Sequence, residues 1–250
     1  FELGTRKFSP QSYALSSSWQ WLPQWRLSAN ASRTERAPKD YELFANGPHI
    51  ATAAWERGQS GLGLEKANSM DLTEQWQEGP HELKLTAFQS RFANFIGLLG
   101  TSEFQEDLPL QVYNGVRAKF SGFEASGQWR LMQSGGTLDL TWRADAVRAQ
   151  NLSTGEALPR ISPLRFGSSL VHTSGPWNSH LGFDWHAAQN RVPEPRGDAI
   201  KGATSAFTLW HAHVGYKQKV SGGVLNWFTR IDNLSNQWAY SATSILTTTA

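Results

Sequence analysis

Four residues in the last third of the chain have the chemistry and the spacing of a metal site. Asp184 and His186 are two residues apart, and so are His211 and His213. Residues two apart in a β-strand point to the same face, so each pair would project from one side of its strand. Imidazole and carboxylate groups are good zinc ligands, and Asp184 can instead hold an imidazole ring in place. The spacing predicts a zinc-type site, although histidines with period two are also ordinary members of a polar strand face.

A second candidate lies in the long connection over residues 33–58. His49 follows a Gly-Pro pair there, and Asp40 and Glu42 precede it. These three residues can catch a metal ion at the entrance to a ligand path. A histidine after Gly-Pro more commonly helps to fix a turn, and this reading stays open beside the first.

The elements that must position the first group are two alternating segments, 177–190 and 207–219, separated by a loop over 191–203. Apolar residues occupy one face of each segment, and the candidate ligands occupy the other. Two such segments predict an antiparallel pair of strands, in which facing side chains lie about 5 Å apart. The pairing predicted here brings Asp184 and His186 roughly level with His211 and His213.

The same alternation recurs along the whole chain. The clearest predicted strands cover 13–22, 25–32, 67–77, 82–96, 110–132, 138–146, 164–173, 177–190, 207–219 and 224–231, with a shorter candidate at 1–7. The parity of the 110–132 segment slips near Gly122, which predicts a bulge. One face is apolar and the other is small and polar, the reverse of the apolar interior of a soluble all-β protein.

Connection lengths alternate as regularly as the side chains do. Short Pro- and Gly-containing turns follow the first strand of each pair, and long connections follow the second, including 33–58 and 97–109. All short turns then fall at one end of a sheet and all long loops at the other. This is the organisation of an outer-membrane β-barrel. The predicted fold is all-β: an antiparallel transmembrane β-barrel fragment of about 11 strands.

Composition and motifs argue against nucleic-acid binding and against catalysis. The chain has 250 residues, no Cys, a formal net charge of +2 and 12 Trp. Scattered Lys and Arg do not form the basic stripe of a nucleic-acid binder. No acyl-transfer or glycosidase constellation is present, and no nucleotide-binding loop, so we predict that the protein is not an enzyme.

Short motifs in a fixed order resemble those of TonB-dependent outer-membrane receptors. They are Arg36-Ala37-Pro38, Glu42-Leu43-Phe44-Ala45, Gly47-Pro48-His49, Asn94-Phe95-Ile96, Leu158-Pro159-Arg160, Pro163-Leu164-Arg165 and Asp232-Asn233-Leu234. They span nearly the whole chain. The stretch 239–246 looks most like the zinc-type branch of that family.

The resemblance implies a 22-stranded barrel around an N-terminal plug, of which residues 1–250 would be the C-terminal part. The plug, the first half of the barrel and the last strand would then lie outside this sequence. It also implies the outer membrane of a Gram-negative bacterium, contact with membrane lipid, and energy from the TonB complex through the plug. The implied function is active uptake of a scarce nutrient. Zinc would be the transported ligand, and no prosthetic group is expected.

Three alternatives remain at this stage. A receptor for a ferric siderophore or another metal chelate would favour aromatic and Arg-rich loops over His and carboxylate clusters. A passive porin would have no plug. A soluble, Trp-rich all-β binding protein would stay in solution without detergent.

Overall fold

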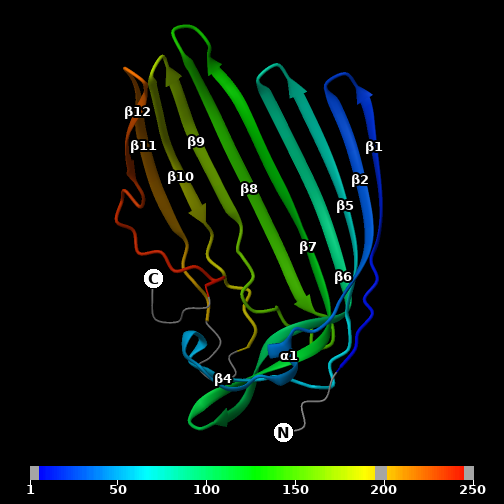
Figure 1. Cartoon of the computed structure of the whole chain (residues 1–250). Helices are drawn as coiled ribbons and strands as arrows, with labels where there is room; N and C mark the ends of the chain where they lie inside the picture. The colour runs from blue at the N-terminus through cyan, green and yellow to red at the C-terminus, as the bar shows by residue number, and fades with distance from the viewer. Residues whose placement is uncertain (1–5, 195–201, 245–250) are drawn as a thin grey trace.

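Strands dominate the computed structural model, which describes residues 6–194 and 202–244. Ten strands form a wall in which each strand pairs with its neighbours in the chain, in the order β1-β2-β5-β6-β7-β8-β9-β10-β11-β12 (Figure 1). Their bounds are β1 (Tyr13–Leu22), β2 (Trp25–Arg36), β5 (Glu65–Glu78), β6 (His81–Gln105), β7 (Leu108–Met132), β8 (Thr137–Asn151), β9 (Arg165–Ser174), β10 (Trp177–His186), β11 (Phe207–Val220) and β12 (Gly223–Ile231). The wall is antiparallel throughout, as the alternation predicted.

The register gives this wall one continuous apolar face. Leu15 lies opposite Ala31, and Ala31 lies opposite Met70. The same face continues through Phe123 of β7 to Leu181 of β10. Leu15 is 77% exposed and Met70 is 67% exposed, although both are apolar. Large apolar side chains are left on an outer surface only where lipid or another apolar partner covers them. The opposite face is therefore the luminal face.

Tryptophans gather at the short-turn end of the outer face. Trp25 packs between Trp21 and Trp76, with ring centroids 5.9 and 6.3 Å away. Trp129 stacks on Trp142 at 6.0 Å. Rings of this kind form the interfacial girdle of a membrane barrel, where an apolar body meets lipid and a polar edge meets water.

The connection at 33–58 is ordered rather than irregular. It contains the helix α1 (Asp40–Phe44), the strand β3 (Asn46–His49), a 3-10 turn over Ile50–Thr52, and the strand β4 (Ala54–Arg57). Hairpin β3–β4 joins the wall by a parallel pairing of β4 with β7, where Trp55 lies opposite Leu110. Trp55, Leu110 and Val112 are buried together, so this contact removes apolar surface from water and holds the hairpin in place.

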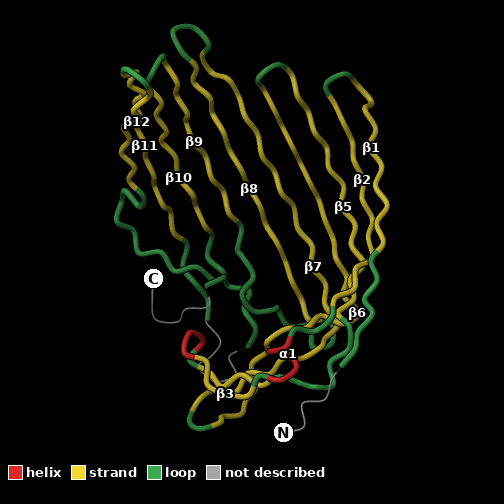
Figure 2. The backbone as a smooth tube through the Cα atoms, viewed as in Figure 1, coloured by secondary structure: helices red, strands yellow, loops and turns green. Residues whose placement is uncertain are grey.

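The prediction of a long loop over 97–109 is wrong. Strands β6 and β7 continue through this segment and meet in a turn at Glu106 and Asp107, both of which have positive φ. Figure 2 shows this extension curving away from the wall together with the β3–β4 hairpin. The two strands pair with each other up to this turn. Leu99 packs against the cluster that contains Leu158, and Leu108 packs against the cluster that contains Trp55 of β4.

No bulge occurs at Gly122, where Phe88 lies directly opposite in an uninterrupted register. The irregularity lies instead in β6, between Phe92 and Phe95. The apparent slip in parity arises because aromatic residues also occupy the luminal face near the long-loop end. Phe92, Phe95 and Phe120 contact one another there, with centroids 5.2–5.3 Å apart.

A buried cluster of Ala118, Ala149 and Leu158 lies beneath these rings. Segment 152–164 therefore folds back over the inside of the wall. Among the residues that the structure describes, no helix has the length and apolarity needed to span a membrane.

Candidate functional site

Strands β10 and β11 set the geometry of the first candidate group. His211 lies opposite Gly182, and His213 lies opposite His180. Asp184 is level with Leu209, and His186 is level with Phe207. The predicted alignment of the two pairs is therefore wrong, because the strands pair two to four residues away from it. Register cannot be read from alternation alone, since any shift by two residues preserves the faces.

The register nevertheless gathers a polar group on the luminal face. Asp184 Oδ2 lies 3.9 Å from His211 Nδ1, and Asp184 Oδ1 accepts a hydrogen bond of 2.7 Å from Arg143 of β8. The rings of His180 and His211 are 4.9 Å apart. We call Arg143, His180, Asp184, His211 and His213 the luminal cluster. His180 and Arg143 were not among the candidates, although His180 has the same parity as Asp184.

His186 lies outside the luminal cluster. Its ring stacks on Phe207 with a centroid distance of 4.4 Å. Three of the four predicted ligands thus come together with His180, and the fourth lies against an aromatic ring further along the strand.

Two glycines make room for the luminal cluster. A Cβ at Gly182 would lie 2.6 Å from His211 Nε2, and a Cβ at Gly167 would lie 2.5 Å from Asp184 Oδ1. The imidazole and the carboxylate therefore lie flat against the wall. A cleft with a volume of ≈ 480 Å³ opens in front of them. It also touches Arg230, Asp232 and Asn233.

The chemistry of this cleft is mixed. Asp184 already shares its charge with Arg143, and Arg230 is paired with Asp232 at 2.9 Å. In the described part of the chain, no three His, Asp or Glu side chains are placed to hold one metal ion. Imidazole and guanidinium N–H groups can instead donate to anionic oxygens of a ligand, at charge-assisted strength.

The second candidate group, His49, Asp40 and Glu42, does not form one site: His49 and Glu42 belong to two separate sets of contacts at the long-loop end. His49 Nδ1 lies 3.1 Å from Thr52 Oγ1 and 3.5 Å from Glu56 Oε1. Tyr113 donates to Glu56 Oε2 over 3.3 Å. Burial, reinforced by the Glu56 charge, raises the pKa of Tyr113 above its ordinary value, so the hydroxyl keeps the proton that it donates.

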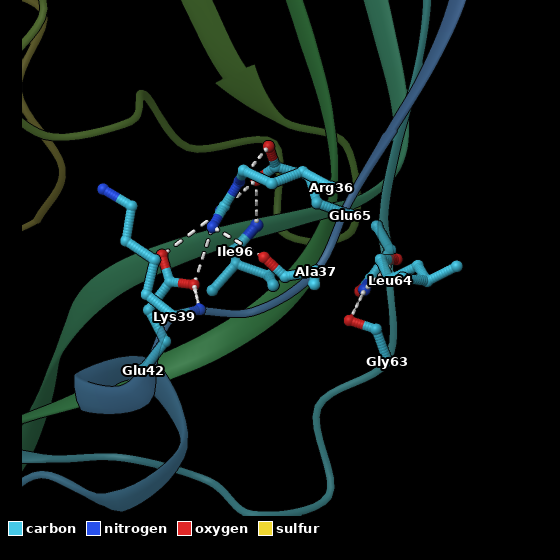
Figure 3. A network of polar contacts seen from close by, with 9 residues as sticks. Arg36, Ala37, Lys39, Glu42, Gly63, Leu64, Glu65 and Ile96 are labelled. Atoms are coloured by element: carbon cyan, nitrogen blue, oxygen red, sulfur yellow. Dashed lines mark hydrogen bonds and ion pairs between the residues drawn. The ribbon is translucent and has the colours of Figure 1, made fainter. Parts of the chain in front are cut away.

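Glu42 belongs to a different network, centred on Arg36 (Figure 3). Arg36 makes two hydrogen bonds to Glu65, of 3.1 and 3.0 Å, and two to Glu42, of 2.8 and 3.2 Å. A fifth, of 3.3 Å, goes to the Ala37 carbonyl oxygen. All five guanidinium N–H groups are used. Hydrogen bonds that Arg36 donates to Glu65, opposed by partial burial and assisted by those to Glu42, raise the pKa of Arg36.

The two carboxylates extend this Arg36 network into the backbone. Glu42 accepts a 2.7 Å hydrogen bond from the Lys39 backbone N–H, and Glu65 accepts one of 2.9 Å from the Ile96 N–H. Helix α1 is thereby tied to β2, β5 and β6. Asp40 is exposed on α1. The structure thus does not bring His49, Asp40 and Glu42 together.

Comparison with known proteins gives the family. The family model "TonB dependent receptor-like, beta-barrel" matches residues 2–234. The chain belongs to this family. The prediction from the motifs is confirmed at this level, and the zinc-type branch is not.

Solved structures of this family share the fold. The copper transporter OprC superimposes with a TM-score of 0.75 at 19% identity, over 92% of this chain and 34% of that one. The unliganded ferric citrate transporter FecA gives 0.68 at 17% identity, over 90% and 33%. A ferric enterobactin receptor, PfeA, gives 0.64 at 18% identity, over 89% and 35%. This chain spans about a third of their length.

Membership of the family has coarse functional consequences. TonB-dependent receptors are outer-membrane transport proteins of Gram-negative bacteria, and they carry no prosthetic group. The metals or chelates that they bind are cargo.

Proposed function

We propose that this chain is the C-terminal part of a receptor that takes up a metal-bearing nutrient by TonB-dependent active transport. In this proposal the plug, the first barrel half and the last strand lie elsewhere in the parent protein, and the plug contacts the TonB complex. The observation that supports it most is a family match over residues 2–234, combined with a polar luminal face behind an apolar outer face.

The form of cargo that the geometry favours is a metal chelate with anionic oxygen atoms. The three histidines of the luminal cluster and Arg230 face one cleft of ≈ 480 Å³, a size suited to an organic ligand. A chelate brings its own metal ligands, so the protein need supply only donors and positive charge. The relatives described above include receptors for ferric enterobactin and ferric citrate.

Zinc remains a second candidate on one specific observation. His180 and His211 have rings 4.9 Å apart, and Asp184 lies 3.9 Å from His211. Binding a bare ion would require these side chains to rotate toward a common centre, at distances of about 2 Å.

Isothermal titration of the full-length receptor in detergent separates the two cargoes. Ferric citrate, ferric enterobactin and zinc chloride would be titrated separately into the wild type and into His211→Ala with His213→Ala. We expect a ferric chelate to bind, and the double variant to lose at least tenfold in affinity, because charge-assisted hydrogen bonds are each worth about 1.5–3 kcal/mol. His172→Ala, on the outer face near a short turn, is the matched control.

The outcomes are distinct. Zinc binding that is lost in the double variant would replace the chelate with the bare ion. Chelate binding that is unchanged in the double variant would remove the luminal cluster from the cargo path and leave the family assignment intact.

A further inference from the structure

Four cations gather on the outer face of the wall, on the side away from the luminal cluster. Arg91 of β6 lies directly opposite Lys119 of β7. Arg117 lies two residues before Lys119 on the same face, and Arg148 of β8 pairs with Ser121, two residues after it. We call Arg91, Arg117, Lys119 and Arg148 the outer cation group. Arg91, Arg117 and Arg148 are exposed, and Lys119 is half-buried.

The outer cation group has no counter-charge of its own. The structure gives none of these four side chains an ion pair within the described residues. Between the outer cation group and the short-turn end, the outward positions of β6, β7 and β8 hold no Asp or Glu. The acids of these strands there, such as Glu124 and Asp145, point into the lumen. The nearest outward acid we find is Glu35 of β2, which Arg33 and Lys66 engage at 3.5 and 3.7 Å.

Like charges directly opposite each other destabilise an antiparallel pair. Arg91 and Lys119 occupy such positions, with Arg148 and Arg117 at the diagonals. An anion that bridges these cations would reduce their repulsion and stabilise the strand pair. Arginine forks match phosphate oxygens in pairs, so a phosphorylated group suits the site better than a single carboxylate.

Depth in the membrane identifies the source of that anion. Lys119 and the girdle residue Trp129 are ten residues apart in β7. At about 3.3 Å per residue, this separation is about 33 Å along the strand. A strand tilt of about 40° reduces it to about 25 Å, the height of the apolar band of such barrels. Lys119 therefore lies at the interface opposite the Trp girdle, on the long-loop side, where lipid headgroups begin.

We propose that the outer cation group binds the phosphorylated headgroup of an anionic lipid in the leaflet at the long-loop end. This inference rests on the membrane placement of the barrel and not on the identity of the cargo. Failure of either proposal therefore leaves the other standing.

Native mass spectrometry of the full-length receptor in neutral detergent tests the proposal. The probe is a diphosphorylated glycolipid, lipid A, compared with its dephosphorylated form and with inorganic phosphate as competitor. We expect wild type to retain the phosphorylated form preferentially. Arg91→Gln with Lys119→Gln and Arg148→Gln should lose about fivefold per cation, on the order of a hundredfold together.

A matched triple variant on the luminal face of the wall, Arg26→Gln with Lys84→Gln and Lys217→Gln, should bind lipid as wild type does. Equal retention by the outer triple variant, or equal binding of the dephosphorylated lipid, would overturn the proposal. Displacement of lipid by inorganic phosphate at equal concentration would also overturn it, because the group would then be a general anion site.

The single variant Lys119→Gln provides a test that does not depend on a triple variant folding. Removing one of two opposed cations should raise the thermal midpoint in neutral detergent. The same change should lower the midpoint when the phosphorylated lipid is present. A lowered midpoint in both conditions would show a purely structural role and would contradict the proposal.

Discussion

The Arg36 network and the luminal cluster each pair an arginine with a carboxylate, and they differ in how many of the arginine N–H groups are satisfied. Arg36 donates all five of its N–H groups to two carboxylates and a carbonyl oxygen, and Glu42 is only 5% exposed. In the luminal cluster, Arg143 makes one contact with Asp184 and remains largely exposed. A saturated network holds structure together, whereas an unsaturated one keeps donors free for a ligand.

The largest effect should follow from Arg36→Ala. The change leaves Glu42 and Glu65 close together without their shared cation, and Glu42 is buried. Removing one partner of a buried pair costs about 3 kcal/mol or more. We expect helix α1 and hairpin β3–β4 to become sensitive to protease, measured by cleavage within residues 37–64.

Arg36→Lys is the conservative control for this prediction. It keeps the charge but cannot form two paired contacts, so protection should be intermediate. Full protection of the segment in Arg36→Ala would show that the network is dispensable.

Gly58→Ala should give a smaller effect in the same region. A Cβ at Gly58 would lie 2.6 Å from backbone atoms of Leu43 and Phe44, which cannot yield as a flexible side chain can. Overpacking of this kind costs about 1–3 kcal/mol. Hydrogen exchange of the Gly58 amide, which donates to Ala45 O over 2.7 Å, should accelerate. Gly61→Ala, with open space at its Cβ, should leave exchange unchanged.

In the luminal cluster, Asp184→Asn should change binding much more than stability. The contact to Arg143 is partly exposed, and such pairs contribute only about 0–1 kcal/mol. We expect a thermal midpoint close to that of wild type and an altered affinity for ferric chelates, measured by calorimetry. A large loss of stability would place Asp184 with Arg36 among the structural residues.

The smallest effect concerns pH at the long-loop end. The pKa of Tyr113 is raised in the folded protein by burial and by Glu56, so the folded state holds its proton more tightly than the unfolded state. Stability from this group is complete below the ordinary tyrosine value of about 10 and falls as pH rises above it. Amide exchange in β4 should accelerate above that pH in wild type and less so in Tyr113→Phe.

Sequence alternation was sufficient to predict the wall of this molecule. Most outward residues of β1, β2 and β5 are apolar, and this pattern follows directly from exposure to lipid. The same reasoning failed where the environment changes. Phe120 is an apolar residue on the luminal face, and it produced the false prediction of a bulge at Gly122. Segment 97–109, which contains three acidic residues, carries no clear alternation, and so it did not predict that residues 97–105 pair with the start of β7 next to them in the sequence.

The luminal cluster could be predicted only in part. Parity placed Asp184, His211 and His213 on one face, but it could not choose between registers two residues apart. His180 was therefore not among the candidate ligands, and His186 was included although it stacks on Phe207. Arg36 appeared only as part of a family motif, and its network was not predicted, because the positions of Glu42 and Glu65 are set by the fold of a connection that alternation does not describe.

The most direct test compares cargo affinity in two variants of the full-length receptor, measured by titration calorimetry with ferric chelates and zinc. We expect His211→Ala with His213→Ala to lower the affinity for one cargo at least tenfold while residues 37–64 stay resistant to protease. We expect Arg36→Lys to weaken that resistance while leaving the luminal cluster unchanged. Wild-type affinity in the double histidine variant would contradict the assignment of the luminal cluster to cargo binding.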